Sequence, residues 1–304
     1  QFLDFHRAYY HPSNSYIYYY GDCDMASKLE TLDEDYLSHF DALSIDSSIP
    51  VQKGFGEVRY VSKEYPVAEN ASEEGHTYLT FSAVVSDNNL SAREYIAFDV
   101  LDYALCSTPG APIKKALIDA GIGRDVYSEY ENGTMQPYFA IIAKDTDYER
   151  ISEFVSIIES VLKEQADGGL DHGSLLAALN LFEFKYREAD YGTYPKGLML
   201  GLQMLDSWLY DDMKPFIHII SNDVYADLRA KVDTGYYEEL IKTRLLSDMH
   251  KAVLAVRPVK GLTCAKDKEL ADKLAAYKAS LSKDEIDALV EATSALAKYQ
   301  ETED

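Results

Sequence analysis

Cysteine is scarce in this sequence of 304 residues, and long apolar runs are missing. The three cysteines, Cys23, Cys106 and Cys264, lie far apart and form no C-x-x-C pair, which excludes a disulfide framework and a thiolate metal site. A reducing compartment fits this usage, so we expect the cytoplasm or an organelle matrix. No apolar run approaches the roughly 20 residues that a membrane-spanning helix needs, and no membrane partner is expected.

Positive charge is also in short supply. Lys and Arg total 29 against 52 Asp and Glu, which gives a formal net charge of -23. Such a field repels phosphate backbones and anionic lipid surfaces, so nucleic acid is excluded as a partner class. The acidity either serves solubility or attracts basic peptides, and composition alone leaves both readings open.

Motifs for metal binding and catalysis are missing as well. Among the seven histidines no H-E-x-x-H or H-x-x-E-H occurs, so no two imidazoles share a helical face with a glutamate between them. His6 and His11 come closest to a pair, but Pro12 ends that helix. His218 and His250 lie among apolar residues, where we expect core or boundary histidines with satisfied hydrogen bonds. The sequence predicts no metal, no cofactor and no catalytic residue.

The two ends show no processing signals. Gln1 is not a natural initiator, and no charged, apolar and small-residue segments follow it as in a signal peptide. The chain is therefore expected to open inside a folded element and to end in a connector, as a fragment would.

The first part of the chain reads as helix, strand, helix and linker. An aromatic stripe at helical spacing predicts a helix over Phe2–Tyr10, and the apolar run that follows predicts a strand over Ser15–Tyr20. A second helix is predicted over Met25–Phe40. Apolar periodicity then lapses from residue 41, and residues 47–56 are expected to form an interdomain linker.

A second unit follows the linker. Alternating apolar residues predict strands, helical periodicity predicts helices, and Asn132-Gly133 predicts a tight hairpin turn. The expected strands are 57–65, 76–85, 126–131, 136–144 and 251–257, the last ended by Pro258 and placed inside the sheet by its apolar centre. The expected helices are 91–104, 113–120, 148–165, 173–189, 198–209 and 224–246.

The tail is predicted to be a helical hairpin. Residues 267–301 are rich in Ala, Lys, Glu and Leu, and a capping box at Ser282–Glu285 opens the second helix. Together the patterns predict an α+β fold with an antiparallel-rich mixed sheet, helices on one face and this C-terminal hairpin.

Several segments resemble a known family. The similarity covers nearly the whole chain in the family's order and is carried by residues 5–22 (FHRAYYHPSNSYIYYYGD), 104–123, 125–144 and 186–198 (YREADYGTYPKGL), with the tail from about residue 282. These stretches resemble the presequence-protease subgroup of the pitrilysin/insulinase-type zinc metallopeptidases. The fold implied is that of pitrilysin and the mitochondrial processing peptidase.

This resemblance implies a chain without chemistry of its own. In the family, four homologous domains enclose an unfolded peptide, and zinc is held by H-x-x-E-H and a downstream glutamate in the first domain; those ligands are absent here. Residues 1–46 match the end of the first domain, 57–265 the non-catalytic second domain and 266–304 the connector between halves. The implied partners are unfolded peptides and the remaining domains of a hydrolase that is active only as a whole. The alternative is a stand-alone non-catalytic binding or assembly subunit.

The resemblance also implies a site. In insulin-degrading relatives the second domain has an exosite, a surface away from the zinc that captures one substrate end by strand pairing. The positions that match it are Ser107, Thr108, Gly110, Ala111, Ser128 and Tyr130. Pro109 weakens the match because it has no backbone donor, and the same loop could simply join two helices.

Overall fold

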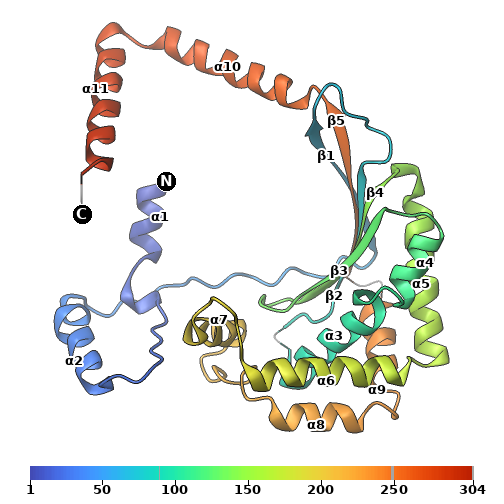
Figure 1. Ribbon diagram of the computed structural model, residues 1–304. Coiled ribbons are helices and arrows are strands. Elements are labelled where there is room, and N and C mark those ends of the chain that lie inside the picture. The colour runs from blue at the N-terminus through green and yellow to red at the C-terminus, as the bar shows by residue number, and fades with distance from the viewer. Residues whose placement is uncertain (89, 248–249, 303–304) are drawn as a thin grey trace.

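A five-stranded mixed sheet is the centre of the computed structural model, which describes residues 1–88, 90–247 and 250–302 (Figure 1). The strand order is β1-β5-β2-β4-β3, with β1 parallel to β5 and every other pair antiparallel. The strands are β1 (Val58–Val67), β2 (Thr77–Val84), β3 (Asp125–Glu131), β4 (Tyr138–Thr146) and β5 (Lys251–Lys260).

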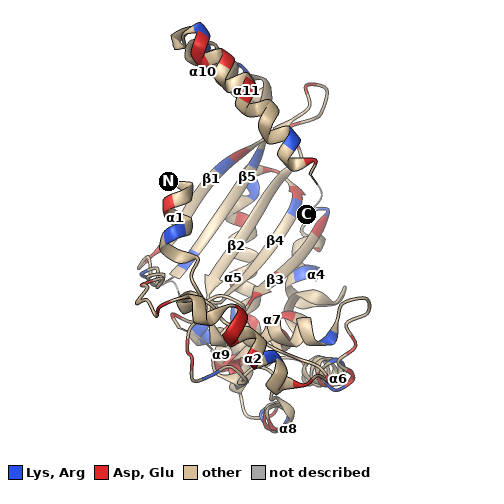
Figure 2. Ribbon diagram, turned by 90° about the vertical axis from the view of Figure 1, so that its left-hand side faces the viewer, with Lys and Arg blue, Asp and Glu red and all other residues tan. Residues whose placement is uncertain are grey.

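One face of this sheet is covered by helices and the other is open (Figure 2). Along β2 the side chains alternate, as a strand with two unlike faces requires. Leu79 and Phe81 are buried against the helices, whereas Tyr78 and Thr80 point to the other face and stay partly exposed. This arrangement confirms the predicted α+β fold with helices on one face.

The helical layer supplies the rest of the core. Its buried side chains come mainly from α3, α5 and α6, which lie against the inner residues of the sheet. The helices of the layer are α3 (Ala92–Asp102) with a π-helical turn (Tyr103–Ser107), α4 (Pro112–Asp119), α5 (Ile151–Gly168), α6 (His172–Glu188), α7 (Lys196–Trp208), α8 (Asn222–Ala230) and α9 (Tyr236–Leu240) with a second π-helical turn (Ile241–Leu245). Short 3-10 turns occur at Pro12–Asn14, Leu37–His39 and Tyr148–Arg150.

The β3–β4 hairpin is confirmed, but its loop is wider than the tight turn predicted at Asn132-Gly133. Glu131 pairs with Tyr138, so residues 132–137 form a wider loop. Its backbone is held by side chains, since the Gly133 N–H donates to Glu131 Oε1 (2.9 Å) and Tyr210 Oη donates to the Gly133 carbonyl (3.1 Å). Contacts outside the hairpin therefore decide the loop geometry, and a local turn signal could not show them.

Strand β5 is interior, as predicted, but Pro258 does not end it. The strand continues to Lys260, and Pro258 pairs with Tyr65 of β1. On its other side β2 pairs only as far as Val256. The N–H that proline lacks faces this unpaired side, where no ladder hydrogen bond is lost.

The single helix predicted over residues 224–246 is two helices. Helix α8 ends at Ala230, and α9 begins at Tyr236 after Gly235, which has a φ of 77°. Glycine adopts this left-handed conformation without a steric penalty, so the chain can turn there.

The N-terminal segment contains helices α1 (Phe2–Tyr9) and α2 (Met25–Asp35), close to the predicted ones. The strand predicted over Ser15–Tyr20 is wrong, because this stretch is extended but pairs with no described strand. Its tyrosine rings lie instead on α7. A Cβ at Gly201 would come 2.8 Å from the Tyr18 ring, so a helix glycine makes room for this packing.

The tail forms the two predicted helices, α10 (Leu262–Ser280) and α11 (Lys283–Gln300), but the hairpin is open: the helices meet at a wide angle and do not pack side by side (Figure 1). Ser282 and Glu285 make both hydrogen bonds of the capping box that starts α11. Neither helix has a buried residue, and the hairpin projects away from the sheet (Figure 1).

Candidate functional site

Strand β3 is an edge strand, and part of its backbone faces away from the sheet. The Val85 N–H donates to the Pro137 carbonyl, so odd-numbered residues of β4 direct their peptide groups at β2. The register pairs Ser128 with Ile141 and Tyr130 with Phe139. The peptide groups of Ser128 and Tyr130 therefore point away from β4, to the free edge where another strand could pair.

The loop after α3 lies beside this edge. The π-helical turn that precedes the loop contacts β3, and Asp102 joins the two. Ser107 Oγ donates to Asp102 Oδ2 at 2.9 Å, and interaction with the Ser128 side chain lowers the pKa of the same carboxyl. Two residues predicted from the resemblance thus meet at one carboxylate at the end of α3.

Burial dominates the electrostatics of this corner. It raises the pKa of the Asp102 carboxyl, and the hydrogen bonds from Ser128 and Ser107 oppose that shift. One turn earlier on α3, burial and the Asp102 charge raise the pKa of Asp99 to about 7. Oδ1 of Asp102 has no hydrogen-bond partner in the described structure. The corner combines two acids of raised pKa with a hydroxyl donor that orients Asp102.

The other residues predicted for this site have different environments. Ala111 is buried and closes a turn by donating its N–H to the Thr108 carbonyl (3.0 Å). Gly110 is exposed, with open space where a side chain would be. The Tyr130 ring packs on Phe98 (5.6 Å), so Tyr130 presents its backbone rather than its hydroxyl to the free edge.

Asp102 was missed by sequence reasoning. It follows Asp99 by three residues on a helix whose other inner residues are apolar, including Phe98 and Leu101. Two acids on the buried side of a helix are unusual, because ionised carboxylates are costly to bury without partners. The three-residue spacing of Asp99 and Asp102 on this helix was the feature of the sequence that could have indicated the site.

The open face of the sheet continues from this edge. Val61 and Tyr127 are exposed on the two outer strands, and Tyr78, Thr80 and Ser82 lie between them on β2. This face offers aromatic rings and hydroxyl groups rather than a dry apolar surface.

A groove separates the N-terminal segment from the rest of the molecule. Its volume is about 990 Å³, and it is lined by Ser13–Tyr16, residues 45–51, Thr134–Gln136 and Leu209, Tyr210 and Asp212. Tyr16 spans it, with Oη donating to Asp212 Oδ1 at 2.8 Å. The segment is attached to the domain by few contacts of this kind.

No group of three or more His, Cys, Asp or Glu residues that could hold a metal ion occurs within residues 1–88, 90–247 and 250–302. His6 stacks on Tyr10, and His11 Nδ1 accepts from the Ser13 N–H (3.1 Å). The donor set for a zinc ion is therefore missing from the part of the chain that the structure describes.

The two inner histidines differ from the prediction in one respect. His218 is 1% exposed and stacks on Tyr95 (3.9 Å), but neither ring nitrogen has a hydrogen-bond partner in the described structure, so the expectation of a satisfied histidine is wrong there. Desolvation lowers the pKa of His218 to about 4. His250 is a boundary residue that packs on Phe55 (4.7 Å) and lies 3.6 Å from Asp87 Oδ1.

The described helices include none that is long and apolar enough to span a membrane.

Related sequences extend far beyond this chain. Protein HypA of Clostridium perfringens is 35% identical over 304 residues, which is 100% of this chain and 31% of the relative. Presequence protease 1, chloroplastic/mitochondrial, of Arabidopsis thaliana is 30% identical over 311 residues, covering 100% of this chain and 29% of the relative. The chain thus spans about a third of the length of these curated relatives.

Solved structures share the fold. A protease from Helicobacter pylori superposes with a TM-score of 0.63 at 13% identity, covering 84% of this chain and 58% of that chain. A peptidase M16 inactive domain from Pseudomonas fluorescens gives a TM-score of 0.54 at 13% identity, covering 79% and 52%. The family model described as the peptidase M16 inactive domain matches residues 1–182, and the model of the region associated with subfamily C of these peptidases matches residues 256–304. The chain therefore belongs to the M16 peptidase family, as an inactive domain of its presequence-protease branch.

Proposed function

We propose that this chain is a non-catalytic part of a larger zinc-dependent peptidase and that it binds unfolded peptide substrates. The observation that carries the proposal is the free edge of β3, which lies next to the loop of residues 107–111 and continues into an open sheet face. The peptide groups of Ser128 and Tyr130 would pair with an extended peptide, and the open face would form one wall of the space that encloses it.

Backbone pairing suits a binding site that must accept many sequences. Main-chain hydrogen bonds are the same for every residue except proline, so affinity does not depend on one side chain. The tyrosines and hydroxyl groups of the open face add contacts of low specificity. A net charge of -23 favours basic peptides among these substrates.

The arrangement of buried residues supports the proposed domain division. Residues 1–57 and 261–302 contain no buried residue, whereas the intervening part contains the whole described core. We propose that residues 1–46 complete a preceding domain, that 47–56 link it to the domain of residues 57–265, and that 266–304 begin a connector. The threefold greater length of the relatives favours this arrangement over a stand-alone subunit.

The edge can be tested with one position and two substitutions. Ser128→Pro removes the outward N–H together with the hydroxyl, and Ser128→Ala removes the hydroxyl alone. Proline is tolerated on an edge strand whose N–H is unpaired, so both variants should fold. Binding of a short, unstructured, basic peptide carrying a fluorophore is measured by anisotropy. Loss of one main-chain hydrogen bond predicts about tenfold weaker binding for Ser128→Pro than for Ser128→Ala.

A photo-cross-linking amino acid locates the bound peptide. Placed at Tyr127 on the open face, it should capture the peptide, whereas at Leu176 on α6 it should not. Equal affinity of the two Ser128 variants, or equal capture at both positions, would show that the peptide binds elsewhere.

A further inference from the structure

The junction between the sheet and the helical hairpin has little packing to define it. Strand β5 ends at Lys260, Gly261 has a φ of 70°, and α10 begins at Leu262. From Thr263 to Ser280 every residue of α10 is exposed. The direction of the hairpin therefore depends on the backbone conformation at Gly261 and on the contacts of the residues beside it, because α10 is not packed against the domain.

The loop between β1 and β2 is hydrogen-bonded to the end of β5 at this junction. Oε1 of Glu73 accepts a hydrogen bond from the Lys260 N–H at 2.7 Å. Lys260 is beyond the last residue of β5 that pairs with β2, so the Glu73 carboxylate takes the place of a strand partner there. A charged acceptor makes this bond stronger than a neutral one would.

The same loop is fixed at its other end. The Gly75 N–H donates to Asp147 Oδ1 at 2.8 Å, and the Tyr65 hydroxyl donates to the His76 carbonyl at 2.7 Å. Asp147 lies directly after β4, at the corner that leads into α5. The loop thus runs from a rigid corner of the domain to the last residue of β5, next to Gly261.

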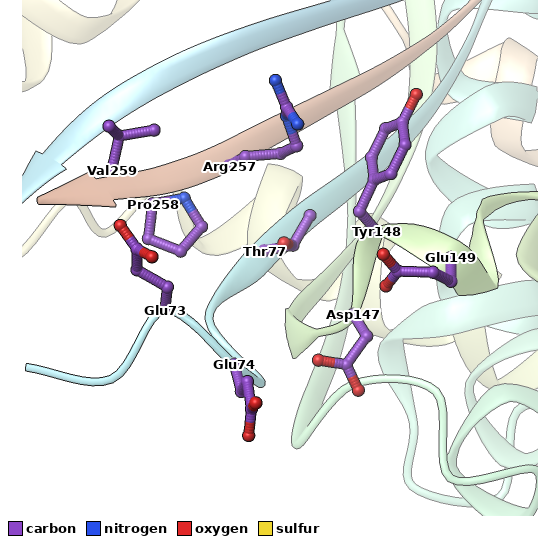
Figure 3. A pocket seen from close by; sticks show the side chains of 9 residues that line it. All are labelled: Glu73, Glu74, Thr77, Asp147, Tyr148, Glu149, Arg257, Pro258 and Val259. Atoms are coloured by element: carbon purple, nitrogen blue, oxygen red, sulfur yellow. The ribbon is translucent and has the colours of Figure 1, made fainter.

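A hollow of about 220 Å³ lies beneath this loop, between Glu73, Asp147 and the end of β5 (Figure 3). Arg257 lines the hollow and donates to Glu64 Oε1 of the neighbouring strand β1 (3.1 Å), and its guanidinium lies 5.2 Å from the centre of the Tyr148 ring. Because the space is not filled by apolar side chains, the loop is held by its polar contacts at the two ends. Releasing one end leaves it free to move.

We infer that the β1–β2 loop, residues 68–76, is a strap that fixes the angle at which α10 and α11 leave the sheet, and that Glu73 is its fastening. With Glu73 in place, Lys260 is held to the domain, and the hinge before α10 is confined to Gly261. Without it, the end of β5 frays, so the hinge lengthens and the hairpin samples more orientations relative to the open face of the sheet.

The test measures the angle directly in the whole chain. Cys23 and Cys264 are replaced by serine, buried Cys106 is kept, and spin labels are attached at Lys163→Cys on α5 and Lys298→Cys on α11. Pulsed electron paramagnetic resonance then gives the distribution of distances between the labels. Glu73→Ala should broaden this distribution about twofold, because the hairpin samples more orientations.

Two matched variants separate the hydrogen bond from general effects. Glu73→Gln retains an acceptor oxygen and should keep the narrow distribution, and Glu74→Ala removes a neighbouring charge that lines the same hollow and should also keep it. Exchange of the Lys260 amide proton provides a second measurement, and it should be about tenfold faster in Glu73→Ala. An unchanged width and unchanged exchange in Glu73→Ala, or an equal broadening in Glu74→Ala, overturns the inference.

Discussion

The domain of residues 58–260 and the segments on either side of it use apolar residues in opposite ways. In the domain, Phe98, Phe139 and Phe154 are among the least exposed residues of the molecule. In the flanking segments, Phe2 and Phe5 on α1 and the leucines of α10 are largely exposed. Large apolar side chains thus form a buried core in one region and remain exposed to solvent in the other.

This difference teaches that apolar periodicity predicts a helix more reliably than it predicts what the helix packs against. Both regions have amphipathic helices, but only the central one has a sheet whose inner face can cover them. Extended exposed apolar surface usually marks an interface. The flanking segments are therefore the places where we expect other parts of a larger protein to bind.

The largest expected effect comes from comparing one phenylalanine in each region. Phe98 is 0% exposed, so Phe98→Ala should lower the free energy of unfolding by about 3–5 kcal/mol through lost burial and a cavity. Phe5 is 58% exposed, and Phe5→Ala should change the free energy by less than about 0.5 kcal/mol. Urea unfolding of both variants measures the difference. Equal losses would mean that α1 contributes to the same cooperative unit.

A smaller effect depends on pH. The pKa of His218 is lowered by burial from 6.5 to about 4. Between these values the unfolded chain binds more protons at this residue than the folded one, so the contribution of His218 to the free energy of unfolding rises with pH and is constant above about 6.5. On acidification that contribution should fall by about 1.4 kcal/mol per pH unit. The raised pKa of Asp99 acts in the opposite direction over the same range, so the His218 contribution is measured as a difference between variants, by urea unfolding at several pH values.

Two phenylalanine substitutions isolate this histidine. His218→Phe retains the stacking on Tyr95 and lacks the titrating group, so its free energy of unfolding relative to the unsubstituted chain should rise by about 1.4 kcal/mol per pH unit as the pH falls from 6.5 towards 4. His39→Phe, in the exposed N-terminal segment, should show no such pH-dependent difference. A difference between His218→Phe and the unsubstituted chain that does not vary with pH would assign the acid sensitivity to other groups.

The smallest effect on global stability is expected in the tail. Ser282→Ala removes the capping box of α11, which contributes about 1 kcal/mol to the helix. Amide hydrogen exchange should therefore quicken in α11, while the urea midpoint of the domain stays unchanged because the hairpin buries nothing. A shifted midpoint would show that the hairpin and the domain unfold together.

Local signals predicted most of the elements correctly. The capping box at Ser282, the alternation in β2 and the apolar centre of β5 each act within a few residues, and each gave the right element. The errors came where distant groups decide. Tyr18 packs on α7 at Gly201, and its segment pairs with no described strand. The conformation of residues 132–137 depends on a hydrogen bond from Tyr210, which lies outside the hairpin.

The candidate site was predictable only in part. The resemblance indicated Ser107 and Ser128 but gave no reason for their proximity, which rests on Asp102. The free edge depends on which strands neighbour β3, and strand order is a long-range property. The parallel pairing of β1 with β5 was likewise invisible, since the two strands lie at opposite ends of the domain sequence.

That parallel pair also sets the order of events during synthesis. Strand β5 is the last strand to leave the ribosome, yet it occupies the position between the first two, β1 and β2. Until residue 260 has emerged, β1 has no neighbour and one side of β2 is unpaired. The sheet of the nascent domain therefore stays incomplete until β5 is synthesised. Folding that depends on such distant contacts is slow, and the partly folded chain is prone to aggregate.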